Sequence, residues 1–176
     1  GQIDSEYYIA SPDGKNKLLE YDATNGTELL RYFMTAVYEF LTACKRQCFP
    51  MADKDKLKQE EWLTQLKTMW VLSQQPGEYN PIHAHTNCQI SAVMHLKVPE
   101  MLTPKKQHRP ADDGSLVFHS NWSGNFELST PSISFLPKVG DFYIFGAQQQ
   151  HQVYPYRCAE GQKETERRSI SFNAIF

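Results

Sequence analysis

The chain has 176 residues, the usual size of one folding domain, and its composition (40% hydrophobic, 22% charged) is that of an ordinary globular protein. Its 18 basic and 20 acidic residues give a net charge of −2, which argues against a nucleic-acid partner. No apolar run approaches the roughly 20 residues that span a bilayer, so a membrane partner is not expected either.

The first third of the sequence predicts a short strand and two helices. Tyr7 to Ile9 predicts the strand. A first helix is expected to begin at Thr27, as the N-cap, and to end before Pro50. Within it, apolar residues recur at spacings of three and four, as on one buried helix face: Leu30, Phe33, Val37, Phe40, Leu41 and Cys44. The second helix is expected from Asp53 to Lys67.

After Thr68 the pattern changes to short runs in which apolar and polar residues alternate, separated by proline, glycine and asparagine. Many short strands separated by turns predict a sandwich or barrel rather than βαβ units. The polar stretch from Met101 to Gly114 predicts a long loop, which could act as a lid over a site. The runs that predict strands are Met69–Gln74, Ile82–His85, Ser91–Val98, Ser115–His119, Ile133–Leu136, Asp141–Phe145, His151–Tyr154 and Arg168–Ile175.

The whole chain is therefore expected to form a single domain over residues 1–176. In this domain a mostly helical segment (1–67) supports a β core (68–176). The spacing of the four cysteines matches no zinc site, and we expect reduced thiols in a cytoplasmic protein: Cys44, Cys48, Cys88 and Cys158.

The first candidate site is His83-Ala84-His85. Side chains alternate along a strand, so His83 and His85 should point to one side and Ala84 to the other. Two adjacent imidazoles can share one metal ion. A pair of surface histidines would show the same spacing, and the motif alone leaves both interpretations open. A third histidine, His151, opens a later strand, where a lone histidine is more often structural.

The last strand predicts a second candidate site. One face carries apolar residues that should enter a core, at Ile170 and Phe172. The other face is polar along its whole length: Arg167, Ser169, Ser171 and Asn173. This polar face is either exposed on an edge strand or part of a carboxylate site, because a guanidinium binds both carboxylate oxygens and a serine hydroxyl two residues on adds a third donor.

Together these stretches resemble the 2-oxoglutarate- and Fe(II)-dependent oxygenases, in particular a branch of small bacterial and phage members related to prolyl hydroxylases. The resemblance covers the chain from Trp70 to the C-terminus. It implies a mainly β fold with N-terminal helices, a double-stranded β-helix (jelly roll) with iron near one open end. The stretches that carry it are Gly77–His85, Ile90–Pro99, Pro137–Phe145, His151–Pro155 and Arg167–Asn173.

The resemblance also implies roles for individual residues. His83, His85 and His151 would bind the iron and form the catalytic centre, with His85 at the position where the superfamily has a carboxylate. If His85 does not bind, a carboxylate such as Glu78 or Asp141 would have to approach the metal. The residues implied to bind the co-substrate 2-oxoglutarate are Arg167 and Ser169, at its far carboxylate, together with His95 and Asn173.

The implied activity is hydroxylation of an unidentified substrate, a peptide or a small molecule, with succinate and CO₂ as co-products. Two alternatives stay open. One is a three-histidine metalloenzyme that does not use 2-oxoglutarate, such as a zinc hydrolase or a thiol-dioxygenase-like enzyme. The other is a non-catalytic jelly-roll binding module. The presence of Arg167 and Ser169 favours the 2-oxoglutarate-dependent oxygenase, because the alternatives do not require these two residues. The sequence specifies no oligomeric state.

Overall fold

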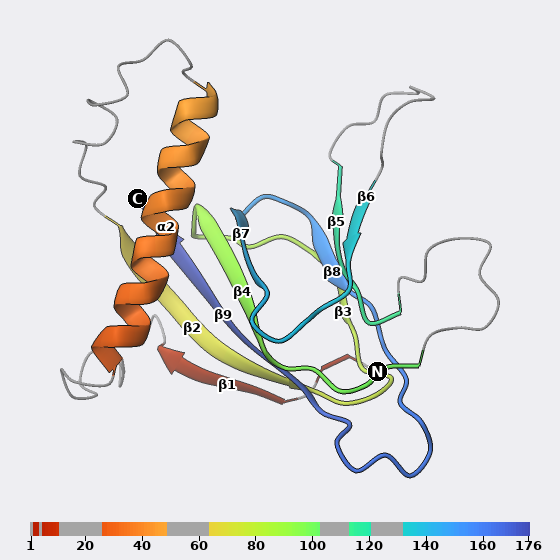
Figure 1. The fold of residues 1–176 in the computed structure, drawn as a ribbon. Helices are drawn as coiled ribbons and strands as arrows, with labels where there is room; N and C mark the ends of the chain where they lie inside the picture. The colour runs from red at the N-terminus through yellow and green to blue at the C-terminus, as the bar shows by residue number, and fades with distance from the viewer. Residues whose placement is uncertain (1, 4, 11–25, 49–63, 103–112, 121–131) are drawn as a thin grey trace, which may run out of the picture.

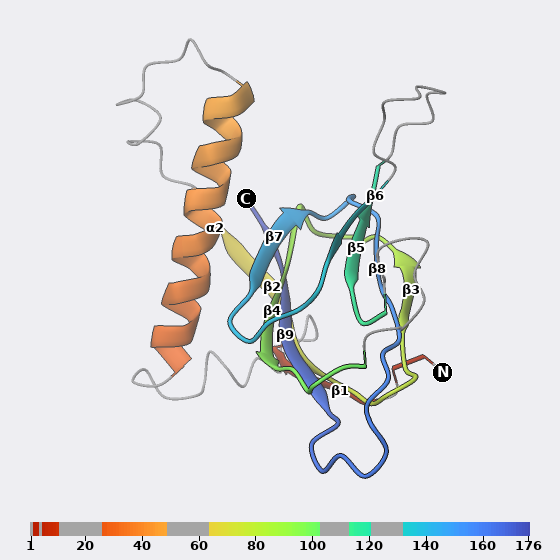
Figure 2. The same ribbon diagram turned by 45° about the vertical axis from the view of Figure 1, so that its right-hand side comes forward.

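The protein is built from two antiparallel β-sheets that face each other and a long helix that covers the outside of one of them (Figure 1). The computed structural model describes residues 2–3, 5–10, 26–48, 64–102, 113–120 and 132–176. The view in Figure 2 shows the sheets as two walls, with the helix beyond the larger wall.

The larger sheet has five strands in the order β1-β2-β9-β4-β7 and the smaller has four in the order β3-β8-β5-β6. From β2 to β9 the chain passes from one sheet to the other at each step, except that β5 and β6 are neighbours. This arrangement is jelly-roll-like. The strands are β1 (Ser5–Ala10), β2 (Gln65–Gln74), β3 (Asn80–His83), β4 (Ile90–Lys97), β5 (Leu116–His119), β6 (Ser132–Phe135), β7 (Phe142–Gly146), β8 (His151–Val153) and β9 (Arg167–Ile175).

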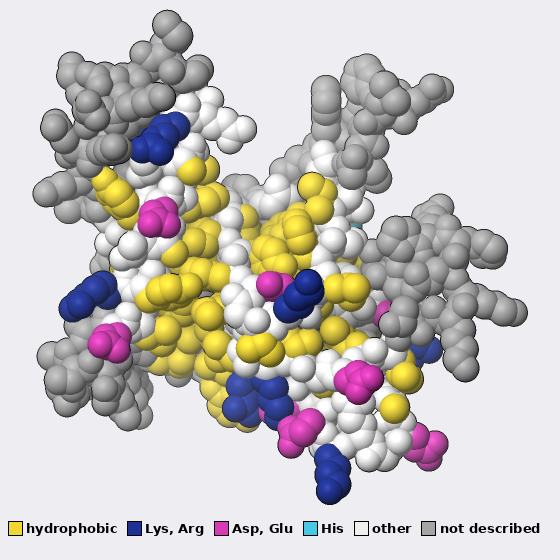
Figure 3. Space-filling model, in the orientation of Figure 1, with side chains coloured by type: hydrophobic (Ala, Val, Ile, Leu, Met, Phe, Trp, Pro, Cys, Tyr) yellow, Lys and Arg dark blue, Asp and Glu magenta, His cyan; other side chains and the backbone are white. Residues whose placement is uncertain are grey.

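The hydrophobic core lies between the helix α2 (Gly26–Cys48) and the outer face of the five-stranded sheet. Its centre is Phe33, which is fully buried and lies against Phe172 of β9, with ring centroids 4.9 Å apart. Apolar side chains reach the surface where the helix meets the sheet (Figure 3). Tyr32, about half exposed, stacks there on Phe142 of β7. The other buried members are Val37, Leu41, Met69, Ile90, Ala92, Ile170 and Ala174.

The expected strands are all present, with their ends shifted by a few residues. The prediction of N-terminal helices is only partly right, because α2 is the only helix in the described part of the chain. It begins at Gly26, so Thr27 lies inside it and is not the N-cap. Most of the expected second helix, residues 53–63, lies outside the described residues. Its last residues belong to β2, because this strand pairs with β9 from Gln65 onwards.

Within the described residues, no helix is both long enough and apolar enough to cross a membrane.

The packing of α2 on the sheet yields a first prediction. Phe33→Ala should lower the free energy of unfolding by about 3–5 kcal/mol, because it removes a buried ring whose neighbours cannot close the cavity. Denaturant titration measures the change, with Glu39→Ala on the exposed side of the helix as the control. A loss below about 1 kcal/mol for Phe33→Ala would contradict this packing.

Candidate active site

A cavity of about 330 Å³ lies between the two sheets. This volume is within the range of roughly 300–1,000 Å³ that small-molecule pockets occupy. The inward faces of β2, β4 and β9 form one wall, and residues of β3, β5 and β8 form the other. Every side chain that the sequence singled out as a site residue lines this cavity: His83, His85, His95, His151, Arg167, Ser169 and Asn173.

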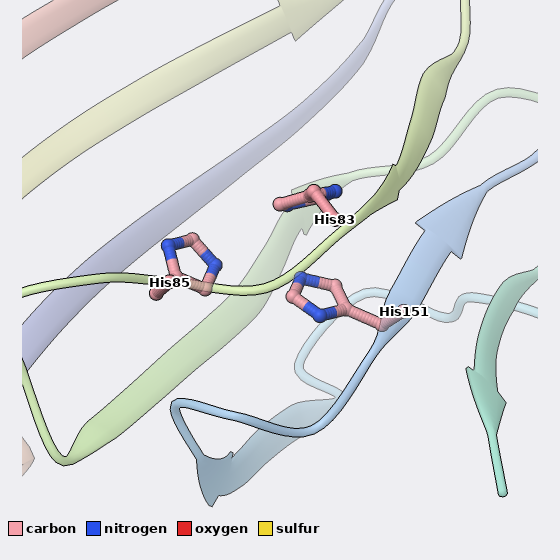
Figure 4. Close-up of side chains that lie close together, drawn as sticks. All are labelled: His83, His85 and His151. Atoms are coloured by element: carbon pink, nitrogen blue, oxygen red, sulfur yellow. The ribbon is translucent and has the colours of Figure 1, made fainter. Parts of the chain in front are cut away.

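Three histidines converge on one point at the wall of the cavity (Figure 4). One ring nitrogen of each lies within 4.8 Å of those of the other two. His83 ends β3 and stands directly opposite His151, which begins β8, with ring centroids 4.1 Å apart. Strand pairing therefore brings together two imidazoles that are far apart in the sequence.

His85 reaches the same point by another route. It lies beyond the end of β3, so the expectation that His83 and His85 share one strand is wrong. Its backbone N–H instead donates to the carbonyl of Ala147, at 2.9 Å, which ties this loop to the turn before His151. Its ring centroid lies 5.2 Å from that of His151.

Backbone carbonyls fix the tautomers of two of the rings. Nδ1–H of His83 donates to the carbonyl of Pro81 (2.7 Å), and Nδ1–H of His151 donates to the carbonyl of Gln149 (2.9 Å). A carbonyl can only accept, so Nδ1 carries the proton and Nε2 of each neutral ring keeps a free lone pair. Nδ1 of His85 instead lies 3.5 Å from the side-chain amide of Asn173.

Burial keeps two rings of this cluster, those of His85 and His151, uncharged near pH 7. It lowers the pKa of His85 to about 4, and the neighbouring His83 contributes to the same shift. The pKa of His151 is also lowered to about 4, again mainly by burial, although its hydrogen bond to Gln149 acts in the opposite direction. Neutral imidazoles are the form that binds metal ions, so protons do not compete with a metal for these two rings near pH 7.

The cluster contains no carboxylate from the described part of the chain. Both acidic residues considered as substitutes for His85 have other partners. Glu78 accepts a hydrogen bond from the backbone N–H of Gln75, and Asp141 accepts one from the backbone N–H of Lys138. The histidine cluster thus offers a metal three nitrogen ligands without a negative charge.

Arg167 lies on the polar face of β9, at the opposite end from Asn173, and is 3% exposed. Its Nε and Nη2 donate to Oε1 of Gln74, and its Nη1 donates to the carbonyl of Gly114. A guanidinium has five N–H donors, so one on Nη1 and one on Nη2 stay unused. Two N–H groups on adjacent nitrogens match the two oxygens of a carboxylate.

No carboxylate in the described part of the protein forms an ion pair with Arg167, although Glu6 also lines the cavity. Burial lowers its pKa to about 10, so it still carries its charge at neutral pH. The ring of Tyr156, 5.1 Å from the guanidinium carbon, stabilises the cation only modestly. A buried charge is costly unless it is paired, so this position favours an anionic ligand.

His95 and Ser169 stand beside Arg167. They face each other across the β4–β9 pair, and each is at most 9% exposed. Neither ring nitrogen of His95 has a hydrogen-bond partner. Burial and, to a lesser degree, the charge of Arg167 lower the pKa of His95 to about 4, so the ring is neutral. An imidazole without partners next to a free guanidinium fork indicates a binding site for a polar ligand.

Sequence reasoning missed Gln74, which has no motif around it. The only signal available was its pairing with Arg167 across β2 and β9, and this requires the strand register. Trp70 and Asn80 also line the cavity, whereas the exposed Tyr79 does not. Most of the expected lid, residues 103–112, lies outside the described residues.

The chain belongs to the family described as "Putative 2OG-Fe(II) oxygenase", whose profile matches residues 68–173. The metal and co-substrate of this family are Fe(II) and 2-oxoglutarate. The family is thus one of oxygenases that use 2-oxoglutarate. A search of curated protein sequences gives no match.

Several solved structures are similar to this chain at low sequence identity. A viral collagen prolyl hydroxylase from Paramecium bursaria Chlorella virus-1, solved with 2-oxoglutarate, is 15% identical over 98% of this chain and 79% of its own, with a TM-score of 0.50. A 2OG-Fe(II) oxygenase family oxidoreductase from Burkholderia pseudomallei is 15% identical over 73% of this chain (TM-score 0.47), and the match spans about half of it, 54%. HygX from Streptomyces hygroscopicus, solved with nickel and 2-oxoglutarate, is 12% identical over 97% of this chain and 82% of its own (TM-score 0.45).

The neutral histidines of the cavity predict how stability depends on pH. In the folded protein the pKa values of His85, His95 and His151 are lowered to about 4, from 6.5 in the unfolded chain. Between these values the unfolded chain binds more protons, so the free energy of unfolding of the metal-free protein should fall as the pH is lowered from 6.5 to 4. Urea titrations at several pH values measure the slope. His95→Gln should reduce it by up to about one proton, and an unchanged slope would contradict the burial of a neutral His95.

Proposed function

We propose that this protein is a 2-oxoglutarate- and Fe(II)-dependent dioxygenase that hydroxylates an organic substrate, a peptide or a small molecule, with succinate and CO₂ as co-products. One observation carries the proposal: the same cavity holds a cluster of three histidine nitrogens and a buried guanidinium with two N–H donors that no described residue uses. A molecule with a 2-oxo acid at one end and a carboxylate at the other is complementary to both.

The proposed iron ligands are His83, His85 and His151. Imidazole nitrogens suit Fe(II), and three protein ligands on one side of an ion leave positions for a co-substrate and oxygen. Because the three ligands are neutral, the full charge of the metal remains within the cavity. This favours an anionic co-substrate more strongly than a ligand set with a carboxylate would.

The proposed partners of the far carboxylate of 2-oxoglutarate are Arg167 and Ser169. The free fork of Arg167 would bind both oxygens, and the hydroxyl of Ser169 would add a donor. His95 has a free ring N–H that can donate to the same group. Asn173, for which the sequence also predicts a co-substrate role, stands at the histidine end of the cavity.

When iron and 2-oxoglutarate are bound, one oxygen atom of O₂ enters succinate as CO₂ is lost, and the other enters the substrate as a hydroxyl group. The residues of this chain bind and orient the reactants. Gln74 and Gly114 hold the guanidinium of Arg167 in place at the wall of the cavity. The two sheets exclude bulk water from Arg167 and His151, which are at most 5% exposed.

The alternatives without 2-oxoglutarate explain less of the cavity. A zinc hydrolase, a thiol-dioxygenase-like enzyme or a non-catalytic binding module gives no reason for a guanidinium that is buried without a counter-charge next to an imidazole without partners. The oxygenase function accounts for both features and for the three histidines with one bound molecule.

The proposed function predicts iron-dependent turnover of 2-oxoglutarate. Protein loaded with Fe(II) should convert 2-oxoglutarate to succinate in air, and His83→Ala or His151→Ala should reduce the rate at least 100-fold, because each removes a metal ligand. Succinate is measured by NMR or by an enzyme-coupled assay. His119→Gln is the matched control, since His119 on β5 does not line the cavity. Folded, iron-loaded protein that neither binds nor consumes 2-oxoglutarate would refute the function.

The carboxylate site predicts a charge effect at Gln74. Gln74→Glu would place a carboxylate against the guanidinium of Arg167, so that the bound 2-oxoglutarate would no longer meet an unpaired cation. The Kd for 2-oxoglutarate should rise at least tenfold while the Kd for Fe(II) changes little; anaerobic calorimetry measures both. The neighbouring exposed Gln75→Glu adds the same charge outside the cavity and should change neither value. Equal effects of the two variants would contradict the proposed role of Arg167.

A further inference from the structure

The three histidines of the cluster differ in what holds their rings. Backbone carbonyls accept from Nδ1–H of His83 and His151, so both rings present Nε2 to the shared point. Nδ1 of His85 has no such carbonyl among the described residues. Its neighbour is the side-chain amide of Asn173 on β9, at 3.5 Å. The orientation of this amide therefore decides which nitrogen of His85 carries the proton.

The two orientations of the amide have opposite consequences. If Nδ2 of Asn173 donates to Nδ1 of His85, the neutral ring carries its proton on Nε2, which then cannot bind a metal. In that orientation Oδ1 of Asn173 is also buried without a partner. If Oδ1 faces His85 instead, it accepts from Nδ1–H, and Nε2 is free in all three rings.

Hydrogen bonding favours the second orientation. A buried polar atom without a partner costs roughly 1–3 kcal/mol, and turning the amide gives Oδ1 a donor. The amide N–H groups then need acceptors. Asn173 lies between Thr68 on β2 and Ser91 on β4, its register partners on either side, and both line the cavity. The hydroxyl of Thr68 is itself buried without a partner and can accept.

We infer that Asn173 is the positioning residue of the metal site, and that its side-chain carbonyl accepts from Nδ1–H of His85 and so makes His85 a metal ligand through Nε2. The inference rests on the proposed function and deepens it. A carboxylate in the place of His85 would need no choice of tautomer. A histidine there needs a partner that selects one, and Asn173 is the side chain in contact with its Nδ1.

The tautomer can be measured directly. Long-range ¹H–¹⁵N NMR spectra distinguish protonated from bare ring nitrogens, and Zn²⁺ serves as a diamagnetic metal probe. In the wild-type protein, without metal and with Zn²⁺, His85 should carry its proton on Nδ1. In metal-free Asn173→Ala this preference should be lost. A proton on Nε2 of His85 in the Zn²⁺-loaded wild-type protein would overturn the inference.

Metal affinity supplies the second measurement. Asn173→Ala should weaken Zn²⁺ binding by about 10- to 100-fold, the usual effect of removing a group that orients a ligand. Asn173→Asp keeps an acceptor for Nδ1–H and should restore binding to near the wild-type value with the wild-type tautomer. Ser171→Ala, on the same face of β9 but with no hydrogen bond to His85 within the described residues, is the matched control and should bind Zn²⁺ normally. Wild-type affinity in Asn173→Ala would refute the inference.

These measurements also separate this inference from the proposed function. Wild-type protein that binds neither Zn²⁺ nor Fe(II) would refute the metal site itself. The tautomer of His85 in metal-free wild-type protein and in Asn173→Ala would still decide whether Asn173 orients the ring. If Asn173→Ala does not fold, the tautomer in the wild-type protein and in Asn173→Asp supplies the test.

Discussion

A positive charge buried between two sheets is the constraint on which the site depends. Arg167 begins β9, and its side chain is held by Gln74 at the end of β2 and by the carbonyl of Gly114 just before β5. Its backbone N–H donates to the hydroxyl of Tyr156, which in turn donates to the carbonyl of Gln74. These groups orient the cation without neutralising it, so the protein carries the cost of an unpaired charge that an anionic ligand would compensate.

Side chains alternate between the two faces of β9, so the same strand contributes both to the charged site and to the hydrophobic core. One face of the strand supplies Ile170 and Phe172 to the apolar layer under α2, and the other supplies Arg167 and Ser169 to the cavity. A shift of one residue would bury the polar face against the helix and expose the core. The packing of Phe33 on Phe172 therefore also fixes the register that aims the polar side chains, although it lies on the opposite side of the sheet.

Much of this architecture could be predicted from local sequence patterns, and the exceptions share a cause. The alternation of apolar and polar residues identified the strands and the two faces of β9, because this pattern depends only on residues that are neighbours in the sequence. Patterns of this kind could not place His85, since a backbone hydrogen bond to Ala147, and not strand geometry, positions its loop. They could not identify Gln74 either, because its role depends on its pairing with Arg167, 93 residues away. The start of β2 at Gln65 was missed for the same reason: pairing with β9 extends the strand into a segment where a helix was expected.

We propose that the histidine cluster and the guanidinium bind the two ends of one molecule. An anaerobic titration of the Fe(II)-loaded protein with 2-oxoglutarate tests it most directly, because a 2-oxo acid that chelates iron gives a visible charge-transfer absorption. This absorption should appear and saturate at one equivalent of 2-oxoglutarate. Folded, iron-loaded protein that develops no such absorption at any concentration of 2-oxoglutarate would contradict it.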